Sequence, residues 1–479
     1  MSVLTTKVGR TISAIALSLI LLIGVVVYVG WYNLFREVPT HFESPAEHFK
    51  YGSIGTENAE GVPYWIWEVM PRLFPEYLPK SGGYTALGLT WEEGNETPVG
   101  ISKKIIGFPR QGITCAVCHS ATYRTSPEEN PIVVPTGPST KFNLQGYVRF
   151  LGSVGKDPRF TADYVLPAIE YNHHLSLLDR VLYRFVLIPR TQEALAELGD
   201  SFTWMDTYSR PPWGPGRIDP FNPVKFRMLN QPEDGSIGNS DMMPLWNKGQ
   251  QEGFALHWDG LEGSLTETVQ TGALGDGATL DSIDLEGLER VEQFIREFQP
   301  PAYPFPIDTA LVDQGKQVFD STCASCHAFG GERTGTIIPV EEVGTDRHRL
   351  DMWTQAAVDA YSAYSDGYSY DFKELRKTDG YVAVALDGLW LRSPYLHNGS
   401  VPYLPDLFEA PENRTPRFYR GYDVYDPDNV GFMAEGPEAE QQGSLYDTSI
   451  PANSNEGHLY GTDLPAEQKT ALVEYLKTL

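Results

Sequence analysis

The sequence predicts a mainly α-helical protein with extensive loops, built as two folded halves behind one N-terminal membrane helix. Three observations predict this organisation: an uncharged apolar run at the N-terminus, a Pro-rich break at residues 299–308, and an amphipathic helical pattern that closes each half. A chain of 479 residues is also too long for one ordinary core, which favours two or more folded units.

The apolar run covers residues 11–35, "TISAIALSLILLIGVVVYVGWYNLF", and contains no charged residue. About 20 apolar residues are enough to cross a bilayer. The preceding residues 1–10 carry the basic residues, so the positive-inside rule makes them a cytoplasmic tail. A cleaved signal peptide is the alternative, but the run exceeds the usual apolar region of about 7–15 residues and no A-x-A site follows it. We expect an uncleaved single-pass anchor in the cell inner membrane, with the bulk of the chain in the periplasm.

The exported part is expected to divide at the linker "QPPAYPFPID", residues 299–308, because its prolines can neither continue a helix nor hold a central strand. This places one domain at residues 36–298 and another at residues 309–479. Apolar residues recur at helical spacing in "DLEGLERVEQFIREF" before the linker and in "LPAEQKTALVEYLKTL" at the end of the chain. Residues 131–282 are rich in Gly, Pro and aromatic residues and predict loops with short helices and few strands.

The exported part is acidic, since the formal net charge of the chain is −26. Such a charge argues against nucleic acid as a partner and suits a basic redox partner protein. Solubility alone, or a salty habitat, explains the same charge. The sequence carries no indication of the oligomeric state.

All four cysteines belong to two C-x-x-C-H pentapeptides, "CAVCH" and "CASCH". A structural zinc site would use paired C-x-x-C units, but these pairs lie far apart and each ends in a histidine. A thioredoxin-like redox pair needs a single C-x-x-C and no histidine. Covalent haem attachment of the c type needs two thiols for the vinyl groups and, directly after them, an imidazole for the iron.

The pentapeptides therefore predict two covalently bound haems c and no disulfides. The thioether attachments would be Cys115, Cys118, Cys323 and Cys326, and the proximal iron ligands would be His119 and His327.

The residues before the second pentapeptide, "TALVDQGKQVF", place Gly315 and Phe319 four apart on a predicted helix. This pattern resembles class I cytochrome c, in which the first helix crosses the last against an aromatic residue, here Tyr475. The first pentapeptide follows "GFPRQGIT" instead, so its domain is expected to have a more divergent cytochrome fold. The expected fold is thus two cytochrome c-like haem domains with extensive loops.

A longer segment, "LDGLWLRSPYLHNGSVPYLPDLF", resembles the signature of the bacterial di-haem cytochrome c peroxidase superfamily. The segments "GYDVYDPDNVGF", "GPGRIDPFNPVK", "PLWNKGQQEGFALHWDG" and "GHLYGTDLPAEQKTALVEYLKTL" are most similar to its rubber-oxygenase-like branch. Residues 36–104 carry no segment of this kind.

The resemblance implies that the second haem has two histidine ligands and that the first haem is the site that meets oxygen. Carried over to this chain, His458 matches the distal histidine of the second haem. Met433 is the alternative ligand. His397 is expected to organise the surroundings of the haem rather than to bind its iron.

For the first haem the sequence shows no evident sixth ligand, and we expect an open or weakly ligated iron. Trp246, His257 and Trp258 lie in a family-like segment and are expected to line the pocket of this haem, with a possible electron path between the haems. Other candidates are better explained by a helix surface or by core packing; they are His173, His174, Met228, Met242 and Met243.

Two functions follow from these expectations. One is a membrane-tethered electron carrier with both haems fully ligated. The other is a haem oxidoreductase acting on peroxide, oxygen or an organic substrate at the first haem, and the family-like segments favour it. The anchor suits a redox partner better than an insoluble polymer, so rubber cleavage itself is not expected.

Overall fold

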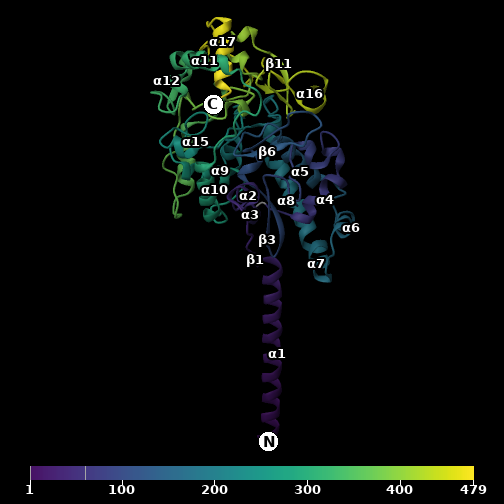
Figure 1. The fold of residues 1–479 in the computed structure, drawn as a ribbon. Helices are drawn as coiled ribbons and strands as arrows, with labels where there is room; N and C mark the ends of the chain where they lie inside the picture. The colour runs from purple at the N-terminus through teal and green to yellow at the C-terminus, as the bar shows by residue number, and fades with distance from the viewer. Residues whose placement is uncertain (1, 60) are drawn as a thin grey trace.

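A computed structural model describes residues 2–59 and 61–479, and about 44% of the chain is helical. The body sits at one end of a long isolated helix (Figure 1). The longest strands, β3 (Ile101–Ile106) and β4 (Phe108–Ile113), have six residues each. A mainly α-helical protein with one N-terminal apolar helix is therefore confirmed.

Helix α1 (Ser2–Leu34) spans the predicted tail and the predicted anchor. Its segment Ile12–Leu34 has 23 residues, a mean hydropathy of 2.8 and no buried residue in its most apolar window, so it is long and apolar enough to cross a membrane. A membrane anchor and a signal sequence both fit these properties.

The largest sheet joins the end of α1 to the first pentapeptide. It is antiparallel and has the strand order β1-β3-β4-β2, with β1 at Glu37–Val38 and β2 at Val62–Pro63. Glu37 pairs with Ile106, so the chain leaving α1 immediately becomes an edge strand. Strand β4 ends at Ile113, directly before the first pentapeptide. Residues 36–104, where no family-like segment occurs, thus form part of the support for this pentapeptide.

The first half contains more helix than its composition suggested, mainly in α5, α6 and α8. Its helices are α2 (Pro45–Tyr51), α3 (Thr56–Ala59), α4 (Tyr64–Leu73), α5 (Leu144–Lys156), α6 (Ala162–Asn172), α7 (Leu177–Leu182), α8 (Ile188–Ser201), α9 (Leu265–Gly275) and α10 (Leu285–Glu297). Its further strands are β5 (Ser120–Tyr123), β6 (Ile132–Pro135), β7 (Arg217–Ile218) and β8 (Ser240–Asp241). Helix α10 confirms the helix predicted before the linker and is capped by Asp284, whose carboxylate accepts from Gly287 N at 2.8 Å.

The second half has fewer long helices. Its helices, long and short, are α11 (Thr309–Thr322), α12 (Ala324–His327), α13 (Val340–Val343), α14 (His348–Met352), α15 (Gln355–Tyr364), α16 (Pro437–Gln442) and α17 (Ala466–Leu476). Short strands complete it: β9 (Ile337–Pro339), β10 (Gly380–Val382), β11 (Arg417–Arg420), β12 (Tyr425–Asp426), β13 (Gly431–Phe432) and β14 (Ser444–Asp447).

Helices α11 and α17 cross at the end of the body opposite to α1 (Figure 1). Gly315 makes the crossing close, because a Cβ atom at this position would lie 1.9 Å from the carbonyl oxygen of Ala471. One turn later the rings of Phe319 and Tyr475 pack with their centroids 5.2 Å apart. The contact predicted between the first and last helices of this half is confirmed.

Hydrophobic clusters join the two halves across the linker. The largest lies within residues 62–242, but a second combines residues 49–295 with residues 352–375. A third packs Tyr123 and Trp246 of the first half against Trp390 and other residues of the second. The linker itself is an extended segment between α10 and α11. The division into domains at residues 299–308 stays a prediction.

Candidate haem-attachment sites

Both pentapeptides fold into one helical turn that closes in the same way. The backbone N–H of His119 donates to the carbonyl of Cys115 at 3.0 Å, and that of His327 donates to the carbonyl of Cys323 at 3.0 Å. The first turn is capped by Thr114, whose hydroxyl accepts from Ala116 N at 3.2 Å. Residues three and four apart on a turn share one face, so each turn groups its two cysteines with its histidine.

The two imidazoles are oriented by equivalent hydrogen bonds. His119 Nδ1 donates to the carbonyl of Met243 at 2.7 Å, and His327 Nδ1 donates to the carbonyl of Val384 at 2.7 Å. Among the described residues neither Nε2 has a hydrogen-bond partner. A backbone carbonyl on one ring nitrogen is the usual support of a metal-binding histidine, because it fixes the tautomer and the ring orientation. Burial lowers the pKa of both rings, that of His119 to about 4, and so keeps them neutral as metal ligands must be.

The four cysteines are all free of disulfides. Burial raises the pKa of Cys115 to about 12 and that of Cys323 to about 11, which disfavours the thiolate that redox chemistry or zinc binding requires. Cys118 and Cys115 pack in the first and second hydrophobic clusters, whereas Cys323 packs against the third. In residues 2–59 and 61–479, no group of three or more His, Cys, Asp or Glu side chains is arranged to hold a metal ion.

A second histidine faces the second pentapeptide. The ring centroids of His327 and His458 lie 6.1 Å apart. Metal–imidazole bonds of about 2.0–2.1 Å would place the centres of two axial rings on one iron roughly 6 Å apart, so this separation fits the predicted haem. His458 Nδ1 is buried and has no partner in the described part of the chain, so this ring lacks the backbone carbonyl that orients His119 and His327. Burial and the nearby His327 lower the pKa of His458 to about 3.

The other two residues considered for the second haem lie in different surroundings. Met433 packs against a separate cluster of Tyr422, Val424 and Ala439. His397 stacks on Tyr381 with a centroid distance of 4.0 Å, and its carbonyl accepts from Asp241 N at 2.8 Å. The geometry favours His458 over Met433 as the residue opposite His327.

The residues expected around the first haem are engaged in hydrogen bonds. His257 Nε2 donates to the buried carboxylate of Glu262 at 3.0 Å, and Trp258 Nε1 donates to the carbonyl of Asp241 at 2.8 Å. Trp246 is buried and donates to the carbonyl of Asp387 at 3.2 Å. These bonds suit walls and supports rather than iron ligands. No ring contact of the described residues gives His119 a facing imidazole.

The remaining histidine and methionine candidates have structural roles. His173 is hydrogen-bonded to Glu68 at 2.5 Å and stacks on Trp65, and His174 is exposed. The side chain of Met242 is buried in the largest cluster, and that of Met228 packs against the second. Met243 contributes its carbonyl, as described for His119.

A polar network that the sequence analysis missed connects the two oriented histidines; we call it the proximal bridge. It consists of Trp246, Asn247, Asp387 and Arg392. Trp246 and Asn247 follow the Met243 carbonyl that holds His119, while Asp387 follows the Val384 carbonyl that holds His327. The Asp387 carboxylate accepts from Asn247 Nδ2 at 2.9 Å and pairs with the buried guanidinium of Arg392. The loops behind the two histidines are therefore cross-linked.

Two titratable groups near the first pentapeptide were also missed. Asp276 ends α9 and keeps some exposed surface, yet it lies deep enough for burial to raise the pKa of its carboxyl to about 7. It interacts electrostatically with both Cys115 and Cys118. Burial likewise lowers the pKa of Lys248, within electrostatic range of His119, to about 8. Shifted groups of this kind cluster at functional sites, so Asp276 is a candidate acid or base beside the first haem position.

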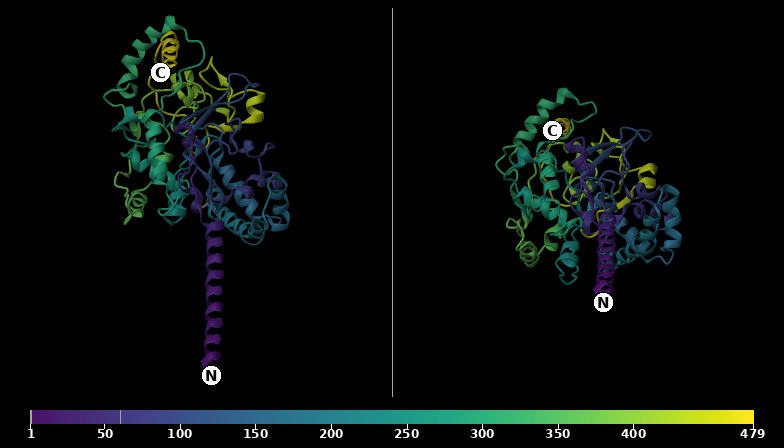
Figure 2. Two further views of the ribbon diagram at one scale, coloured as in Figure 1. Left: turned by 60° about the horizontal axis from the view of Figure 1, so that its bottom comes forward. Right: turned by 90° about the horizontal axis from the view of Figure 1, so that it is seen from below.

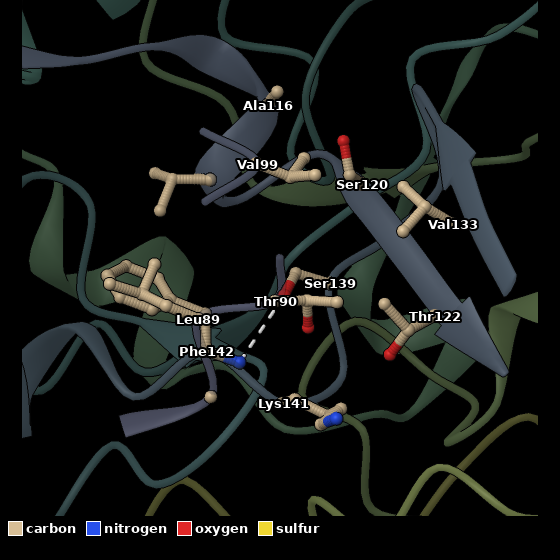
Figure 3. Close-up of a pocket in the computed structure, with 12 residues that line it drawn as sticks. Leu89, Thr90, Val99, Ala116, Ser120, Thr122, Val133, Ser139, Lys141 and Phe142 are labelled. Atoms are coloured by element: carbon tan, nitrogen blue, oxygen red, sulfur yellow. Dashed lines mark hydrogen bonds between the residues drawn. The ribbon is translucent and has the colours of Figure 1, made fainter. Parts of the chain in front are cut away.

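A small, partly open pocket adjoins the first pentapeptide (Figure 3). Ala116 and Val117, the residues between the two cysteines, contribute to its wall. Its other lining mixes hydroxyl-bearing and apolar side chains in about equal number, and Lys141 at its edge is ion-paired with Asp423 at 2.9 Å.

Comparison with known proteins supports a cytochrome c-type protein. Residues 380–420, which contain Asp387 and His397, match the family described as RoxA-like, cytochrome c-like. The chain is also similar to two uncharacterized proteins of Sinorhizobium fredii, y4iM and y4iJ. It is 31% identical to y4iM over 244 residues, 45% of this chain and 54% of the relative. It is 28% identical to y4iJ over 249 residues, 38% of this chain and 41% of that relative. The alignments thus cover about half of each relative or less, and the family match indicates a haem-binding redox protein of the cytochrome c type.

Proposed function

We propose that this protein is a membrane-anchored di-haem c-type cytochrome that works on the extracytoplasmic side of the membrane as a haem oxidoreductase. In this proposal Cys115 and Cys118 hold one haem and Cys323 and Cys326 hold the other. The two haems supply redox chemistry, and the chain supplies their ligands, access and electrostatic surroundings.

One observation carries the proposal: the two pentapeptides share the same closed turn and the same 2.7 Å bond from histidine Nδ1 to a backbone carbonyl. Nothing in a C-x-x-C-H sequence by itself requires its histidine to bond to a backbone carbonyl elsewhere in the chain. Its occurrence at both sites, in halves with different secondary structure, favours two haems over one. The family match lies entirely within the second half, so the assignment of a haem to the first half depends on this similarity of geometry.

The two sites differ in a way that assigns them different roles. His458 faces His327 and would close the second haem for electron transfer. His119 has no facing imidazole among the described residues, and its pentapeptide lies within electrostatic range of Asp276 and Lys248, which can hold or move a proton. We therefore assign the reaction with peroxide, oxygen or an organic substrate to the first site.

Trp258 offers a connection between the sites. Its indole donates to the carbonyl of Asp241, two residues before the Met243 that supports His119. Its own carbonyl accepts from Val382, two residues before the Val384 that supports His327, at 2.8 Å. The indole also packs against the cluster that contains Tyr381. One aromatic side chain thus contacts the loops behind both histidines.

The haem count is tested by the intact mass of the purified chain and by its pyridine haemochrome spectrum. We expect two covalent porphyrins in the wild type and one in the Cys115→Ala/Cys118→Ala variant. One porphyrin in the wild type, retained in this variant, would remove the first site from the proposal.

The activity is tested by absorption and EPR spectra recorded before and after addition of peroxide. The proposal expects a high-spin population from the first haem that reacts with peroxide, together with a low-spin second haem. If both irons are low-spin and indifferent to peroxide, the protein is an electron carrier with both haems fully ligated.

A further inference from the structure

An outward-facing apolar surface lies around α7. We call it the α7 patch, and its side chains are Tyr171, Leu177, Leu178, Val181, Phe185 and Val186. Leu177 is 82% exposed and Phe185 is 68% exposed. The other exposed large apolar residues of the body are more scattered along the chain, whereas these six fall within residues 171–186. Contiguous exposed apolar surface on a folded protein marks a place where it meets a protein or a membrane.

The helical segment that carries most of the patch runs from α7 through a π-helical turn, Tyr183–Leu187, into α8, and it has apolar side chains on two sides. Tyr183, Leu187 and Ile188 face inward and are buried in the largest cluster. Leu177, Val181 and Phe185 are spaced four residues apart and lie along the opposite, exposed side. Asp179, Arg180 and Arg184 interrupt this surface, but the exposed apolar row still faces away from the core.

The α7 patch lies at the end of the body from which α1 leaves. Figure 1 shows α7 at the level where the body meets α1, and the left view of Figure 2 agrees. The exit of α1 from the body is held by the sheet, since Gly107 N donates to the carbonyl of Arg36 at 2.7 Å. Gly107 has φ +73°, and a Cβ atom there would lie 2.4 Å from the backbone of Leu34. This close contact leaves α1 little freedom to swing relative to the body.

Charge does not explain the patch. Arg180 and Arg184, the cations within it, are already ion-paired with Glu170 and Asp163 at 2.6 and 2.5 Å. The chain as a whole carries a net charge of −26, which anionic lipid headgroups would repel. Contact with a membrane at this place would therefore depend on apolar side chains.

We propose that the α7 patch inserts into the surface of the bilayer that α1 spans and gives the body a second point of attachment. The patch would lie at the boundary between the lipid headgroups and the acyl chains, which is where interfacial apolar helices bind. The inference rests on the proposed anchoring by α1, and it is independent of the haem count.

Spin labelling of the full-length protein in phosphatidylcholine vesicles tests this inference. Phe185→Cys and Leu177→Cys each introduce one cysteine for a nitroxide label, and wild type treated with the same reagent reports any native thiol that reacts. Leu445→Cys is the matched control, because Leu445 is 50% exposed and lies in β14, which pairs with β11 at the far end of the body (Figure 1).

We expect labels at residues 177 and 185 to collide with oxygen at least several-fold more, relative to a water-soluble nickel complex, than the label at residue 445. Equal accessibility at all three positions would overturn the inference and leave the patch facing water or a partner protein. Dipolar broadening between labels of different molecules would overturn it in favour of a second copy of the chain. The intact mass separates the two proposals, since loss of α1 rejects the anchoring and the inference together. If α1 is retained and the labels at residues 177 and 185 are exposed to water, the proposed anchoring stands and only the inference about the α7 patch is rejected.

Discussion

The two pentapeptides reach the same local geometry from different surroundings. The first follows the β3–β4 hairpin and sits in a short capped turn, whereas the second continues from α11 through α12. Both nevertheless present a histidine held by a backbone carbonyl at 2.7 Å. This comparison indicates that each site needs its imidazole held by a backbone carbonyl. The pentapeptide itself can follow either a strand or a helix. The facing side differs, with His458 at the second site and Asp276 near the first.

Replacing His458, the histidine that faces His327, should cause the largest change in the difference between the two sites. We expect His458→Ala to convert the second haem from low spin to high spin, because the iron loses one of two imidazole ligands. Absorption and EPR spectra measure the change. Met433→Ala is the control and should leave the spectrum as in the wild type. An unchanged spectrum for His458→Ala would reject this ligand.

Breaking the proximal bridge should affect both sites together. We expect Asp387→Ala to lower the free energy of unfolding by about 3–5 kcal/mol, because it leaves the buried guanidinium of Arg392 unpaired. The reduction potentials of both haems should also shift, since the loops behind His119 and His327 lose the bond from Asn247 to the Asp387 carboxylate and keep only the bond from Trp246 to the Asp387 carbonyl. Urea unfolding and a redox titration measure the two effects.

Asp320→Ala provides the control for this variant. It removes an exposed ion pair with Lys316 and should cost less than about 1 kcal/mol. If Asp387→Ala shifts one potential only, the bridge serves one site and the proposed connection is wrong.

The crossing of α11 and α17 belongs to the second half, and disrupting it should lower the stability of the protein less than breaking the proximal bridge does. We expect Gly315→Ala to destabilise the protein by about 1–3 kcal/mol, because its Cβ atom would collide with the Ala471 carbonyl. Gly272→Ala in α9 is the matched control, with no atom within 4 Å of the added Cβ atom. It should be neutral or stabilising by up to about 1 kcal/mol. Thermal unfolding of both variants checks this contrast.

The smallest expected effect is the pH dependence at Asp276 of the first site. Its folded-state pKa of about 7 lies above the value of about 4 for an unfolded aspartate. The folded state thus binds the proton more tightly, and stability is lost as the pH rises from about 4 to 7. Asp276→Asn should remove this loss and melt roughly 2–4 °C above the wild type at pH 8, but not at pH 4. The same difference at both pH values would contradict the assignment.

Sequence patterns predicted the parts of this fold that depend on local spacing. Helices α10 and α17 follow from apolar residues at helical intervals, and α11 and the contact of Phe319 with Tyr475 follow from one motif. The β1–β3 pairing was not predicted, because two-residue strands have no periodicity and their partners are distant in sequence. The carbonyls of Met243 and Val384 were missed because a main-chain acceptor leaves no mark on residue type. Asp387 stood within a recognised segment, but nothing in its spacing indicated the contact with Asn247.

The direct passage of α1 into β1 has a consequence for how electrons would reach an anchored protein. Soluble redox domains on long flexible tethers can sweep a wide radius and search for a donor. Here only Phe35 and Arg36 separate α1 from β1, and β1 is already part of the sheet. The reach of the body is then set by lateral diffusion of the whole molecule, so a donor or acceptor must itself approach the face of the lipid layer.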